Sequence, residues 1–589
     1  MICVSTRRRV TVLDMARGMA RMTPELGQVA RNAPGLLVRR PTTKSSIGAV
    51  FQDLAGKQPE RTFVIADEGR LTYGEANERV NRYASVLRDA GVKRGDVVGL
   101  LSHNSIDMLL IMLATVKLGA VSGLLNYNQR GDVLDHSLGI LDARVVVLEE
   151  SLRESLETAP SAGQQNVMTL DEMRAAADGA PAPAAQNPSE CAETRGHEKA
   201  YYIFTSGTTG MPKASIMSHH RWLKSYSGLG GLGVRLRPDD TLYCCLPLYH
   251  NNAVTVALGA VLNGGASMAI AGKFSVSNFW DDIVRFDASS FVYIGELCRY
   301  LLGQPERPSE RQHRVRVIVG NGLRTDIWRE FQERFGIERI AEFYGASECN
   351  IAFINAYNLD ETAGTCPLPH KVVRYDPDTG DALRNAKGRL EQVKTGEAGL
   401  LLAKVTSGQP FDGYTDEGET EKKLLRDGFR KGDCWFVTGD LVRRQGFQHV
   451  AFVDRLGDTF RWKGENVATT EVEAALERLP QVQDCAVYGV EVPGSDGRAG
   501  MAAVVLREDF DSSDVAGRLA EMLPKYAVPL FMREVESLEQ TSTFKSRKVE
   551  LRDAGYAGAG DDRVWVLTKE GYVPFYEGYP EDVAGARQP

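Results

Sequence analysis

The sequence lacks the features of several protein classes. Its 589 residues carry a net charge of -8, so there is no overall excess of Lys and Arg of the kind that nucleic-acid binding needs. The nine cysteines form no CxxC pair and have no His-rich neighbourhood at metal-ligand spacing. No apolar region of sufficient length follows Arg7-Arg8-Arg9, which argues against a secretory signal peptide. We therefore expect a cytoplasmic protein with reduced thiols.

Long hydrophobic runs are also scarce. The longest charge-free stretch, residues 253–272, is about long enough to span a bilayer. Asn263-Gly264-Gly265 divides it, and this break favours a buried helix, a turn and a strand over a transmembrane helix. Attachment to a membrane is thus a better hypothesis than crossing it.

The first forty residues differ from the rest in charge. They hold eight arginines against Asp14 and Glu25, a local charge of +6. Apolar residues are interspersed through the same, helix-like stretch, which would suit it to an anionic lipid surface. A frayed or wrongly assigned chain start explains the composition equally well, and both alternatives stay open.

The remainder has the composition and patterning of an α/β protein. With 43% hydrophobic and 25% charged residues, a chain of this length is too long for one core and predicts at least two domains. Apolar runs at 96–101, 143–148 and 316–319 indicate buried parallel strands. Residues 75–90 indicate an amphipathic helix capped by Gly91.

Changes in composition suggest the domain organisation. Residues 159–199 are rich in Ala, Pro, Gly, Gln and Glu, which is typical of a surface linker or long loop. A second change follows Asp454. We therefore expect a basic extension over 1–44, a large domain over 45–454 and a smaller domain over 455–589.

The most informative motif follows a short apolar strand at 201–204. It concentrates hydroxyls, glycines and a lysine in the run Thr205-Ser206-Gly207-Thr208-Thr209-Gly210-Met211-Pro212-Lys213. Glycine lets backbone N–H groups approach an anion closely, while the hydroxyls add donors and the lysine adds charge. The run predicts a polyphosphate cradle. It is not a Walker A loop, because Pro212 precedes the lysine and Ala214 follows it.

This loop resembles the signature loop of the adenylate-forming superfamily, which comprises acyl-CoA synthetases, luciferases and peptide-synthetase adenylation domains. In that family the loop is mobile and holds the β- and γ-phosphates of ATP. The resemblance implies layered sheets and helices in the large N-terminal domain, here the AMP-binding domain. It also implies a smaller, mobile C-terminal α+β domain.

Further motifs occur in the family's order. Tyr344-Gly345-Ala346-Ser347-Glu348 resembles the YGxTE element, which implies Tyr344 beside adenine, Ser347 near the α-phosphate and Glu348 as a ligand of Mg²⁺. A carboxylate suits a hard cation that bridges phosphates. Upstream, the strand at 316–319 leads into a turn resembling the family's glycine-rich turn on adenine, Gly320-Asn321-Gly322.

Two motifs near the domain boundary are implied to hold the ribose. Asp440, in Thr438-Gly439-Asp440, matches a TGD element, and a carboxylate accepts two hydroxyl hydrogen bonds at once. Arg455 matches the arginine before the interdomain hinge. Gly457 stands where the family usually has Asp or Lys, so the pivot residue is left open.

Two C-terminal features complete the resemblance. Lys545 occupies the place of the catalytic adenylation lysine, although Phe544 replaces the usual glycine. An ammonium there would stabilise charge where two anions meet. The alternative is a solvated lysine beside Lys548. Lys463, Gly464 and Glu465 would form the loop on the coenzyme A side.

Residues 126–131 and 454–466 resemble the fatty acid transport protein and very-long-chain acyl-CoA synthetase branch. Pro247-Leu248-Tyr249-His250 matches an element that borders the acyl pocket, which implies a role for His250 near the carboxylate. The small apolar residues of 251–271 would leave room for an alkyl chain.

The resemblance predicts a long- or very-long-chain fatty acid–CoA ligase that uses ATP, Mg²⁺ and coenzyme A. Two alternatives remain: an acyl-AMP ligase that loads a carrier protein, and a membrane-associated fatty acid carrier. Coupling to fatty acid uptake, contact with the inner face of the plasma membrane and a homodimer are further hypotheses.

Overall fold

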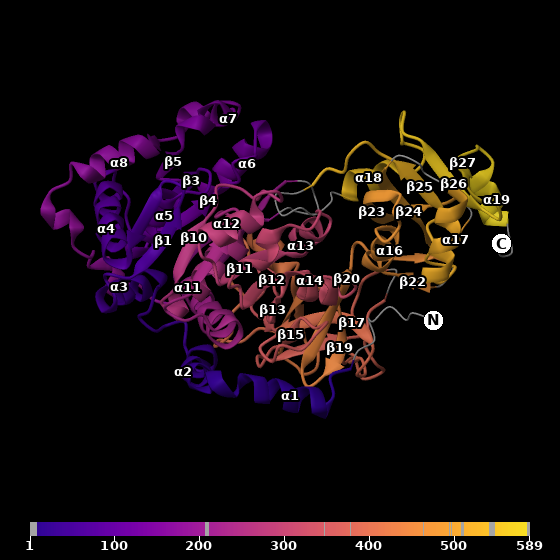
Figure 1. Cartoon of the computed structure of the whole chain (residues 1–589), viewed down its shortest axis with the longest axis horizontal. Coiled ribbons are helices and arrows are strands. Elements are labelled where there is room, and N and C mark those ends of the chain that lie inside the picture. The colour runs from indigo at the N-terminus through magenta and orange to yellow at the C-terminus, as the bar shows by residue number, and fades with distance from the viewer. Residues whose placement is uncertain are drawn as a thin grey trace.

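The computed structural model describes residues 9–205, 211–346, 348–376, 379–462, 465–493, 495, 497–507, 512–540 and 548–585. The chain forms a large body of sheets and helices, and the C-terminal residues form a smaller unit beside it (Figure 1). The predicted fold class, α/β with a smaller α+β domain, is confirmed.

One sheet of the large body carries the strand that leads into the predicted phosphate loop. Its strands are parallel except for the last pair. In spatial order they are β6 (Val167–Thr169), β5 (Val145–Leu148), β3 (Val97–Leu101), β4 (Val121–Leu124), β7 (Lys199–Thr205) and β8 (Lys213–Ser218). The loop therefore joins the antiparallel pair β7–β8 at one edge of the sheet.

A larger sheet begins with a parallel run. An antiparallel edge strand, β2 (Gly69–Thr72), precedes it. The parallel strands are β1 (Thr62–Ala66), β10 (Ser267–Ile270), β9 (Thr241–Cys244), β11 (Ser290–Ile294), β12 (Val317–Asn321) and β13 (Arg339–Tyr344). The carboxyl ends of β12 and β13 therefore lie side by side, which brings together the segments that follow them.

The same sheet continues as an antiparallel half. Its strands are β14 (Phe353–Ile354), β15 (Gly364–Thr365), β20 (His449–Arg455), β19 (Cys434–Gly446), β17 (Ala398–Lys404), β16 (His370–Val373) and, off the main path, β18 (Leu424–Arg426). Short β14 and β15 join the two halves, so β19 and β20 reach the end of β13.

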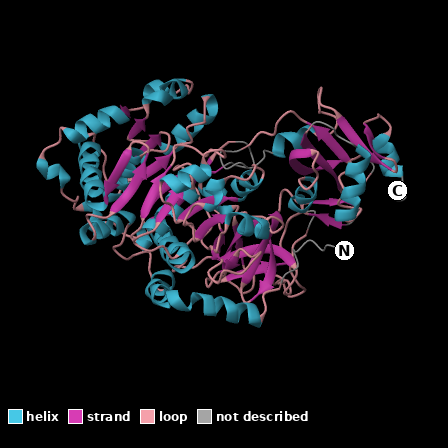
Figure 2. Ribbon diagram, viewed as in Figure 1, coloured by secondary structure: helices cyan, strands magenta, loops and turns pink. Residues whose placement is uncertain are grey.

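Helices fill the space between and outside the sheets (Figure 2). Val98 and Leu100 of β3 belong to the same core as α3 (Ile47–Lys57), α4 (Tyr73–Asp89), α5 (Ile106–Lys117) and the parallel half of the larger sheet. Val97 and Leu101 on the other face of β3 pack with α6 (Gly131–Leu141) and α7 (Arg153–Glu157). Strands buried on both faces explain why these runs are continuously apolar.

Further helices cover the larger sheet or extend from its strands. They are α10 (His219–Ser225), the π-helical segments η5 (Tyr226–Val234) and η6 (Asn252–Ala257), α11 (Leu258–Gly264), α12 (Phe279–Arg285), α13 (Gly295–Leu302) and α14 (Trp328–Phe335). Short elements complete the body: η2 (Glu150–Leu152), η3 (Ala162–Gln164), η4 (Ala182–Ala185), α9 (Glu190–Glu193), η7 (Pro308–Arg311) and α15 (Glu417–Glu421).

The smaller unit has its own core. It contains the hairpin β21 (Phe460–Trp462)–β22 (Glu465–Val467), the sheet β23 (Val482–Glu491), β24 (Arg498–Leu506), β25 (Phe531–Glu534), β26 (Val564–Thr568) and β27 (Gly571–Pro574), and the helices α16 (Thr469–Leu476), α17 (Ser512–Met522), α18 (Lys548–Ala554) and α19 (Tyr579–Gly585). The predicted boundary at 454–455 stays a prediction. The chain leaves the larger sheet where β20 ends.

Polar contacts join the two units. Arg299 of α13 pairs with Asp484 of β23 at 3.0 Å, and Arg324 pairs with Glu477 after α16. Gln540 donates a hydrogen bond to the hydroxyl of Tyr300 at 2.7 Å. Charged and polar groups, rather than a continuous apolar core, thus connect the units.

Several element predictions are confirmed. β3, β5 and β12 coincide with the three predicted strands, and α4 is followed by Gly91 at φ +85°. The stretch 253–272 forms helices, a left-handed turn at Gly265 and β10. Within the described ranges, no helix is both long and apolar enough to cross a membrane. The cysteines described from Cys191 onward are free thiols.

The interpretation of 159–199 as a linker or loop is partly wrong. The stretch contains β6 and the helix α8 (Leu170–Asp178). Thr169 and Glu172 form a reciprocal capping box, and Leu170 and Met173 are buried. Such a box satisfies two N–H groups at the start of a helix. The overall Ala and Pro content obscured this local signal.

The basic N-terminal segment forms helices that lie against the large body. These are α1 (Val12–Met22), η1 (Thr23–Glu25) and α2 (Leu26–Leu37), at the lower edge in Figure 1. Thr11 caps α1 through a capping box with Asp14. α2 packs on η5, where Leu36 contacts Gly228 closely. Residues 12–37 are thus ordered helix in contact with the core, which excludes a frayed start for this part.

Candidate active site

Three residues of the predicted nucleotide set meet where β13, β19 and β20 come together. The hydroxyl of Tyr344 donates a hydrogen bond to a carboxylate oxygen of Asp440. Asp440 lies opposite Arg455 in the β19–β20 ladder, and their charged groups are 3.9 Å apart. The hydroxyl of Thr438 accepts a hydrogen bond from the N–H of Asp440 at 3.1 Å, which fixes the turn. The Arg455 side chain remains 57% exposed and can reach a ligand.

The predicted glycine turn, Gly320-Asn321-Gly322, lies beside this cluster at the end of β12. A Cβ on Gly320 would lie 2.2 Å from the carbonyl oxygen of Tyr293, and Gly322 adopts φ +83°, so both positions require glycine. Asn321 accepts a hydrogen bond from Asn252 at 2.7 Å. The turn thereby connects β12 to η6.

A buried carboxylate supports the same turn from behind. Glu342 of β13 accepts a hydrogen bond from the N–H of Gly322 at 2.6 Å and another from the hydroxyl of Tyr293. Burial raises the pKa of Glu342 to about 8, although these hydrogen bonds favour the charged form. Glu342 therefore holds the turn through its acceptor oxygens.

The phosphate loop is described only at its two ends. Thr205 ends β7 and Lys213 begins β8, while residues 206–210 lie outside the described residues. The ammonium of Lys213 pairs with Glu419. Hydrogen bonds from Lys213 and Lys422 lower the pKa of Glu419 to about 2. Lys213 is thus held by an acidic partner beside the loop in this conformation.

Glu348 is linked to β8 through Tyr414. It accepts a hydrogen bond from the hydroxyl of Tyr414 at 3.0 Å. Tyr414 forms a β-bridge with Ser215, so the strand that leaves the loop also positions the partner of Glu348. Ser347 lies outside the described residues. The described part of the chain holds no cluster of three or more His, Cys, Asp or Glu at metal-binding distance.

Two cationic side chains of α10, Arg221 and Lys224, contact the segment 408–412. Arg221 of α10 lies 4.0 Å from Asp412, and burial lowers its pKa. Lys224, one helical turn further, donates a hydrogen bond to the carbonyl of Gly408 at 2.9 Å. Burial lowers the pKa of Lys224 as well. Of the two, Arg221 interacts electrostatically with Glu348.

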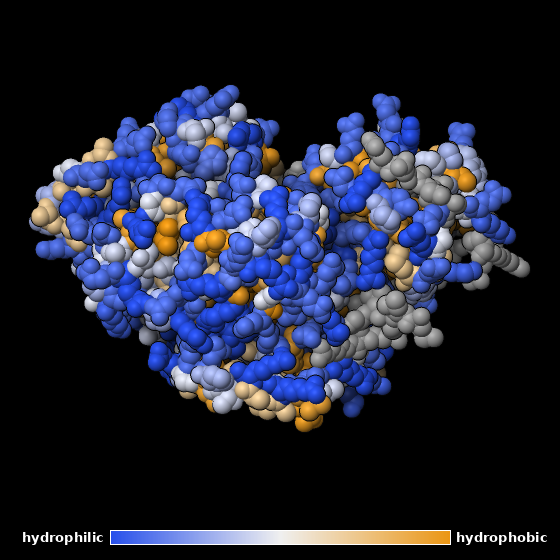
Figure 3. Space-filling view, viewed as in Figure 1, coloured by the Kyte–Doolittle hydropathy of each residue, from blue (hydrophilic) through white to orange (hydrophobic). Residues whose placement is uncertain are grey.

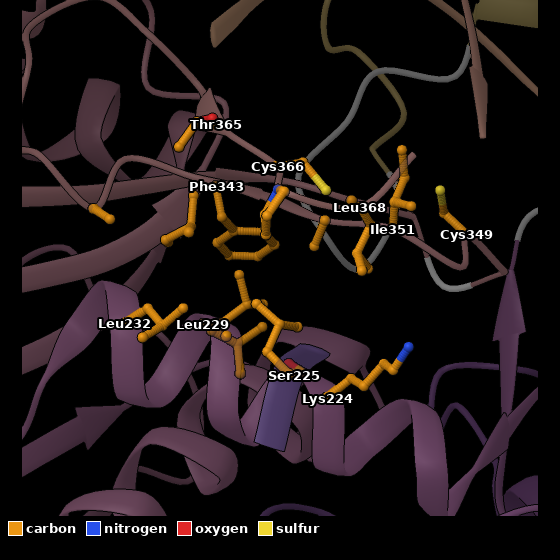
Figure 4. Close-up of a pocket in the computed structure, with 18 of the residues that line it drawn as sticks. Lys224, Ser225, Leu229, Leu232, Phe343, Cys349, Ile351, Thr365, Cys366 and Leu368 are labelled. Atoms are coloured by element: carbon orange, nitrogen blue, oxygen red, sulfur yellow. The ribbon is translucent and has the colours of Figure 1, made fainter. Parts of the chain in front are cut away.

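A mainly apolar cavity of about 560 Å³ opens beside these residues. Gly345 and Ala346, which follow Tyr344, line one part of it. In Figure 4, Leu229 and Leu232 of η5 face Phe343 of β13 and Ile351 across the cavity. Lys224 and Ser225 lie on the same helical wall. Helices α1 and α2 supply further lining residues. The cavity thus extends from the nucleotide cluster to the N-terminal helices.

None of the four residues of the Pro247–His250 element is among the lining residues of this cavity, but Asn251, which follows them, is. Of the stretch 251–271, Asn251, Thr255 and Val256 line the cavity. Room for an alkyl chain beside this stretch stays a prediction. His250 contacts the ring of Tyr249 at a centroid distance of 4.5 Å. A role for His250 near the carboxylate stays a prediction.

The C-terminal predictions fall largely outside the described residues. Lys545, Lys463 and Gly464 lie outside the described residues, whereas Glu465 is described and is exposed at the start of β22. Lys548, three residues after Lys545, is half-buried. Its ammonium lies 2.7 Å from Glu473 and 2.9 Å from the hydroxyl of Thr469. Lys548 therefore serves the packing of the smaller unit.

Asp454, the residue before Arg455, anchors the segment that follows. Burial raises the pKa of Asp454 to about 6, and its carboxylate accepts a hydrogen bond from the N–H of Thr469 at 2.7 Å. Gly457, in the turn between these residues, has open space around its Cα. The structure thus provides a fixed point at Asp454 and a sterically free glycine three residues later.

The sequence reasoning missed most of the cavity wall. The lining of η5 comes from a run with repeated glycines, 228–233, which alone could have signalled close helix packing. The lining of α1 and α2 had a helical spacing, with Met15 and Met22 seven residues apart, but it was interpreted as a lipid-facing pattern.

Comparisons with known proteins agree with the arrangement. Residues 51–404 match the AMP-binding enzyme family, and residues 471–545 match the AMP-binding enzyme C-terminal domain. The chain is 53% identical over 587 residues to the medium/long-chain-fatty-acid–CoA ligase FadD6 of Mycobacterium tuberculosis, covering 98% of each chain. It is 39% identical over 547 residues to long-chain fatty acid transport protein 6 of Mus musculus, covering 88% of this chain and 87% of that one.

Solved structures share the fold. ATP-bound MatB from Rhodopseudomonas palustris superposes with a TM-score of 0.73 at 26% identity, covering 86% of this chain and 98% of that one. A Mycobacterium tuberculosis fatty acyl CoA synthetase superposes with a TM-score of 0.63 at 21% identity, covering 87% and 98%.

Proposed function

Because this chain belongs to the AMP-binding enzyme family, we propose that it is a long-chain fatty acid–CoA ligase that works through an acyl adenylate. A carboxylate oxygen of the fatty acid attacks the α-phosphorus of ATP, and pyrophosphate leaves. The thiol of coenzyme A then attacks the acyl carbon and loses its proton, and AMP leaves. Coenzyme A supplies the nucleophile of the second step, so no residue of the chain needs to form a covalent bond to the acyl group.

One observation carries the choice of a fatty acid. The cavity of about 560 Å³ is mainly apolar, and it reaches Gly345 and Ala346 next to the Tyr344–Asp440 pair. Each methylene buried in such a cavity contributes about 0.8 kcal/mol. An alkyl chain in the cavity would leave its carboxylate beside the nucleotide cluster.

We assign the polar residues by their geometry. Asp440 and Arg455 would hold the ribose, Tyr344 and the Gly320–Gly322 turn would enclose adenine, and the loop from Thr205 to Lys213 would hold the phosphates. The Tyr344–Asp440 hydrogen bond supports the first two assignments. ATP would need to compete with Glu419 for Lys213, because the two side chains are paired.

Glu348 fits a magnesium ligand. Its carboxylate has one described partner, the neutral Tyr414 hydroxyl, so acceptor capacity remains for a cation. Mg²⁺, when bound, would neutralise charge on the phosphates. Arg221, which lies 4.0 Å from Asp412, would add positive charge near Glu348.

We assign Lys545 to adenylation and the Lys463-Gly464-Glu465 loop to the coenzyme A side. In this scheme the C-terminal domain alternates between two positions, with Asp454 as the fixed end and Gly457 as the hinge. The interdomain pair Arg324–Glu477 would break in one of these positions.

The deciding experiment measures pyrophosphate release with fatty acids from short to very long, with and without coenzyme A. We expect release with medium and long acids, and acyl-CoA only when coenzyme A is present. Acyl-AMP that is transferred to a carrier protein but not to coenzyme A would favour the carrier-loading ligase. Fatty acid uptake that an Asp440→Ala variant retains in full would favour the carrier without chemistry.

We also propose a cytoplasmic protein whose N-terminal segment contacts the inner face of an anionic membrane. Val12 and Leu13 of α1 are 74% and 58% exposed, and Arg17 is exposed on the same helix. Hydrophobic and hydrophilic atoms lie side by side along this edge (Figure 3). Co-sedimentation with vesicles that contain phosphatidylglycerol should fall at least threefold in the Leu13→Asp variant; equal binding would contradict the contact. Trapping of fatty acids as acyl-CoA would couple the reaction to uptake.

A further inference from the structure

The N-terminal helices form part of the wall of the acyl cavity. Met15 and Met22 of α1 line it, and so do four residues of α2: Val29, Ala33, Leu36 and Leu37. The methionines are seven residues apart. In α2, Ala33 follows Val29 by four residues and precedes Leu36 and Leu37 by three and four, so each helix turns one face to the cavity. Residues 1–50 lie outside the range that matches the family.

Buried ion pairs hold the junction of the two helices in place. Glu25, between α1 and α2, lies 2.5 Å from Arg235 and 2.7 Å from Arg339. The Arg235 side chain is 3% exposed. Burial alone would raise the pKa of Glu25, but the two guanidinium groups keep it below its usual value. Removing such a buried partner is costly, so the junction is firmly attached to η5 and β13.

The helices also approach the body closely at three glycines. A Cβ on Gly231 of η5 would lie 2.1 Å from Cγ of Asn32, and a Cβ on Gly35 would lie 2.4 Å from the hydroxyl of Ser227. A Cβ on Gly18 of α1 would lie 2.8 Å from Tyr357. Glycines at these positions let the helices approach closely. This close packing indicates that the two helices are an integral part of the large body rather than a loosely attached segment.

The opposite face of α1 provides a contrast. Met19 lies between the two lining methionines in sequence, but it is 51% exposed and does not line the cavity. One helix therefore carries methionines in two environments. This difference supplies an internal control.

We propose that α1 and α2 are the cover of the acyl site and set the length of the acyl chain that it accepts. This inference rests on the proposed ligase function. The free energy of about 0.8 kcal/mol per methylene corresponds to roughly a fourfold change in affinity for each methylene that the cover admits or excludes. Side chains at Met15 and Met22 should therefore shift the chain-length profile.

The test compares Met15→Trp and Met22→Trp with Met19→Trp in the full chain. We measure kcat/KM for octanoate, palmitate and a very-long-chain acid in lipid-free buffer. Each lining variant should lose at least tenfold on palmitate relative to octanoate, because a larger side chain occupies the cavity. Met19→Trp should keep the wild-type ratio. Lining variants with the same ratio as Met19→Trp would overturn the proposal.

Two further measurements separate the possible failures. Met15→Ala and Met22→Ala enlarge the cavity and should raise the relative rate on the very-long-chain acid; an unchanged or lower relative rate would count against the cover. Direct binding of cis-parinaric acid, a fluorescent fatty acid, needs no turnover. If wild-type protein releases no pyrophosphate with any acid, the proposed function fails. Weaker probe binding in Met22→Trp but not in Met19→Trp would still support the cover.

Discussion

The proposed nucleotide side and the proposed acyl side of the site are built in different ways. On the nucleotide side, polar groups of β13, β19 and β20 come together, and Asp440 accepts a hydrogen bond from Tyr344 and lies 3.9 Å from Arg455. On the acyl side, apolar residues from α1, α2, η5, η6 and the edge of β13 surround an empty volume. The full set of lining residues runs in sequence from Met15 to Gln448.

This difference follows from what each side must recognise. A ribose or phosphate requires a particular donor or acceptor at a particular position, so few residue types serve. An alkyl chain requires volume and apolar contact, which many residue combinations supply. Substitutions on the nucleotide side should therefore reduce the reaction with every acid, whereas substitutions on the acyl side should change which acid is used.

The largest effect is expected for Lys545→Ala. We expect acyl-AMP formation to fall at least a thousandfold with every acid, because the ammonium that stabilises the meeting anions is lost. Transfer from supplied acyl-AMP to coenzyme A should survive. Pyrophosphate release and acyl transfer, assayed separately, check this expectation. Equal loss of both steps would contradict the assigned role.

Asp440→Ala should reduce adenylation about a hundredfold. The variant loses the acceptor of the Tyr344 hydroxyl and the proposed ribose contact, and hydrogen bonds to a charged group contribute about 1.5–3 kcal/mol each. The KM for ATP and the chain-length profile are measured together. A changed preference between octanoate and palmitate would contradict the separation of the two sides.

Gly231→Leu should act on the acyl side. Its side chain would collide with Asn32, displace α2 and cost about 1–3 kcal/mol of stability. We expect a changed palmitate-to-octanoate ratio with an unchanged KM for ATP, measured by steady-state kinetics. The control is Gly27→Ala in α2, where a Cβ meets nothing within 4 Å. An altered KM for ATP without a change in acid preference would contradict the separation.

The smallest effect on the reaction is expected for Glu342→Gln behind the glycine turn, where the change concerns the pH dependence of stability. Since the pKa of Glu342 is about 8 in the folded protein and about 4.5 in the unfolded chain, the folded state binds more protons between these values. The free energy of unfolding of the wild type should therefore fall as pH rises from 5 to 8, by at most about 1.4 kcal/mol per pH unit from this group. The variant lacks this contribution.

Thermal unfolding of both proteins across this pH range tests the expectation. The Tm of the variant should rise relative to that of the wild type with increasing pH. A difference that stays constant with pH would show that Glu342 does not titrate between folded and unfolded states.

Sequence reasoning succeeded where function or structure depends on neighbouring residues. The strands β3, β5 and β12 were predictable because continuous burial requires continuous apolar residues. It failed for α8, whose capping box lay in a stretch dominated by Ala and Pro. It also could not predict that Lys548 pairs with Glu473, because the two residues are 75 positions apart in the chain.

By itself, the sequence determined the alternation of strands and helices, the phosphate loop and the consecutive motifs around Tyr344 and Asp440. Local patterns encode these features, because each depends on residues that are adjacent in the chain. Tertiary structure alone decided that Tyr344 bonds to Asp440, that Lys213 pairs with Glu419, and that α1 and α2 line the cavity. A cavity is a volume bounded by distant segments, so its walls exist only after those segments have packed together.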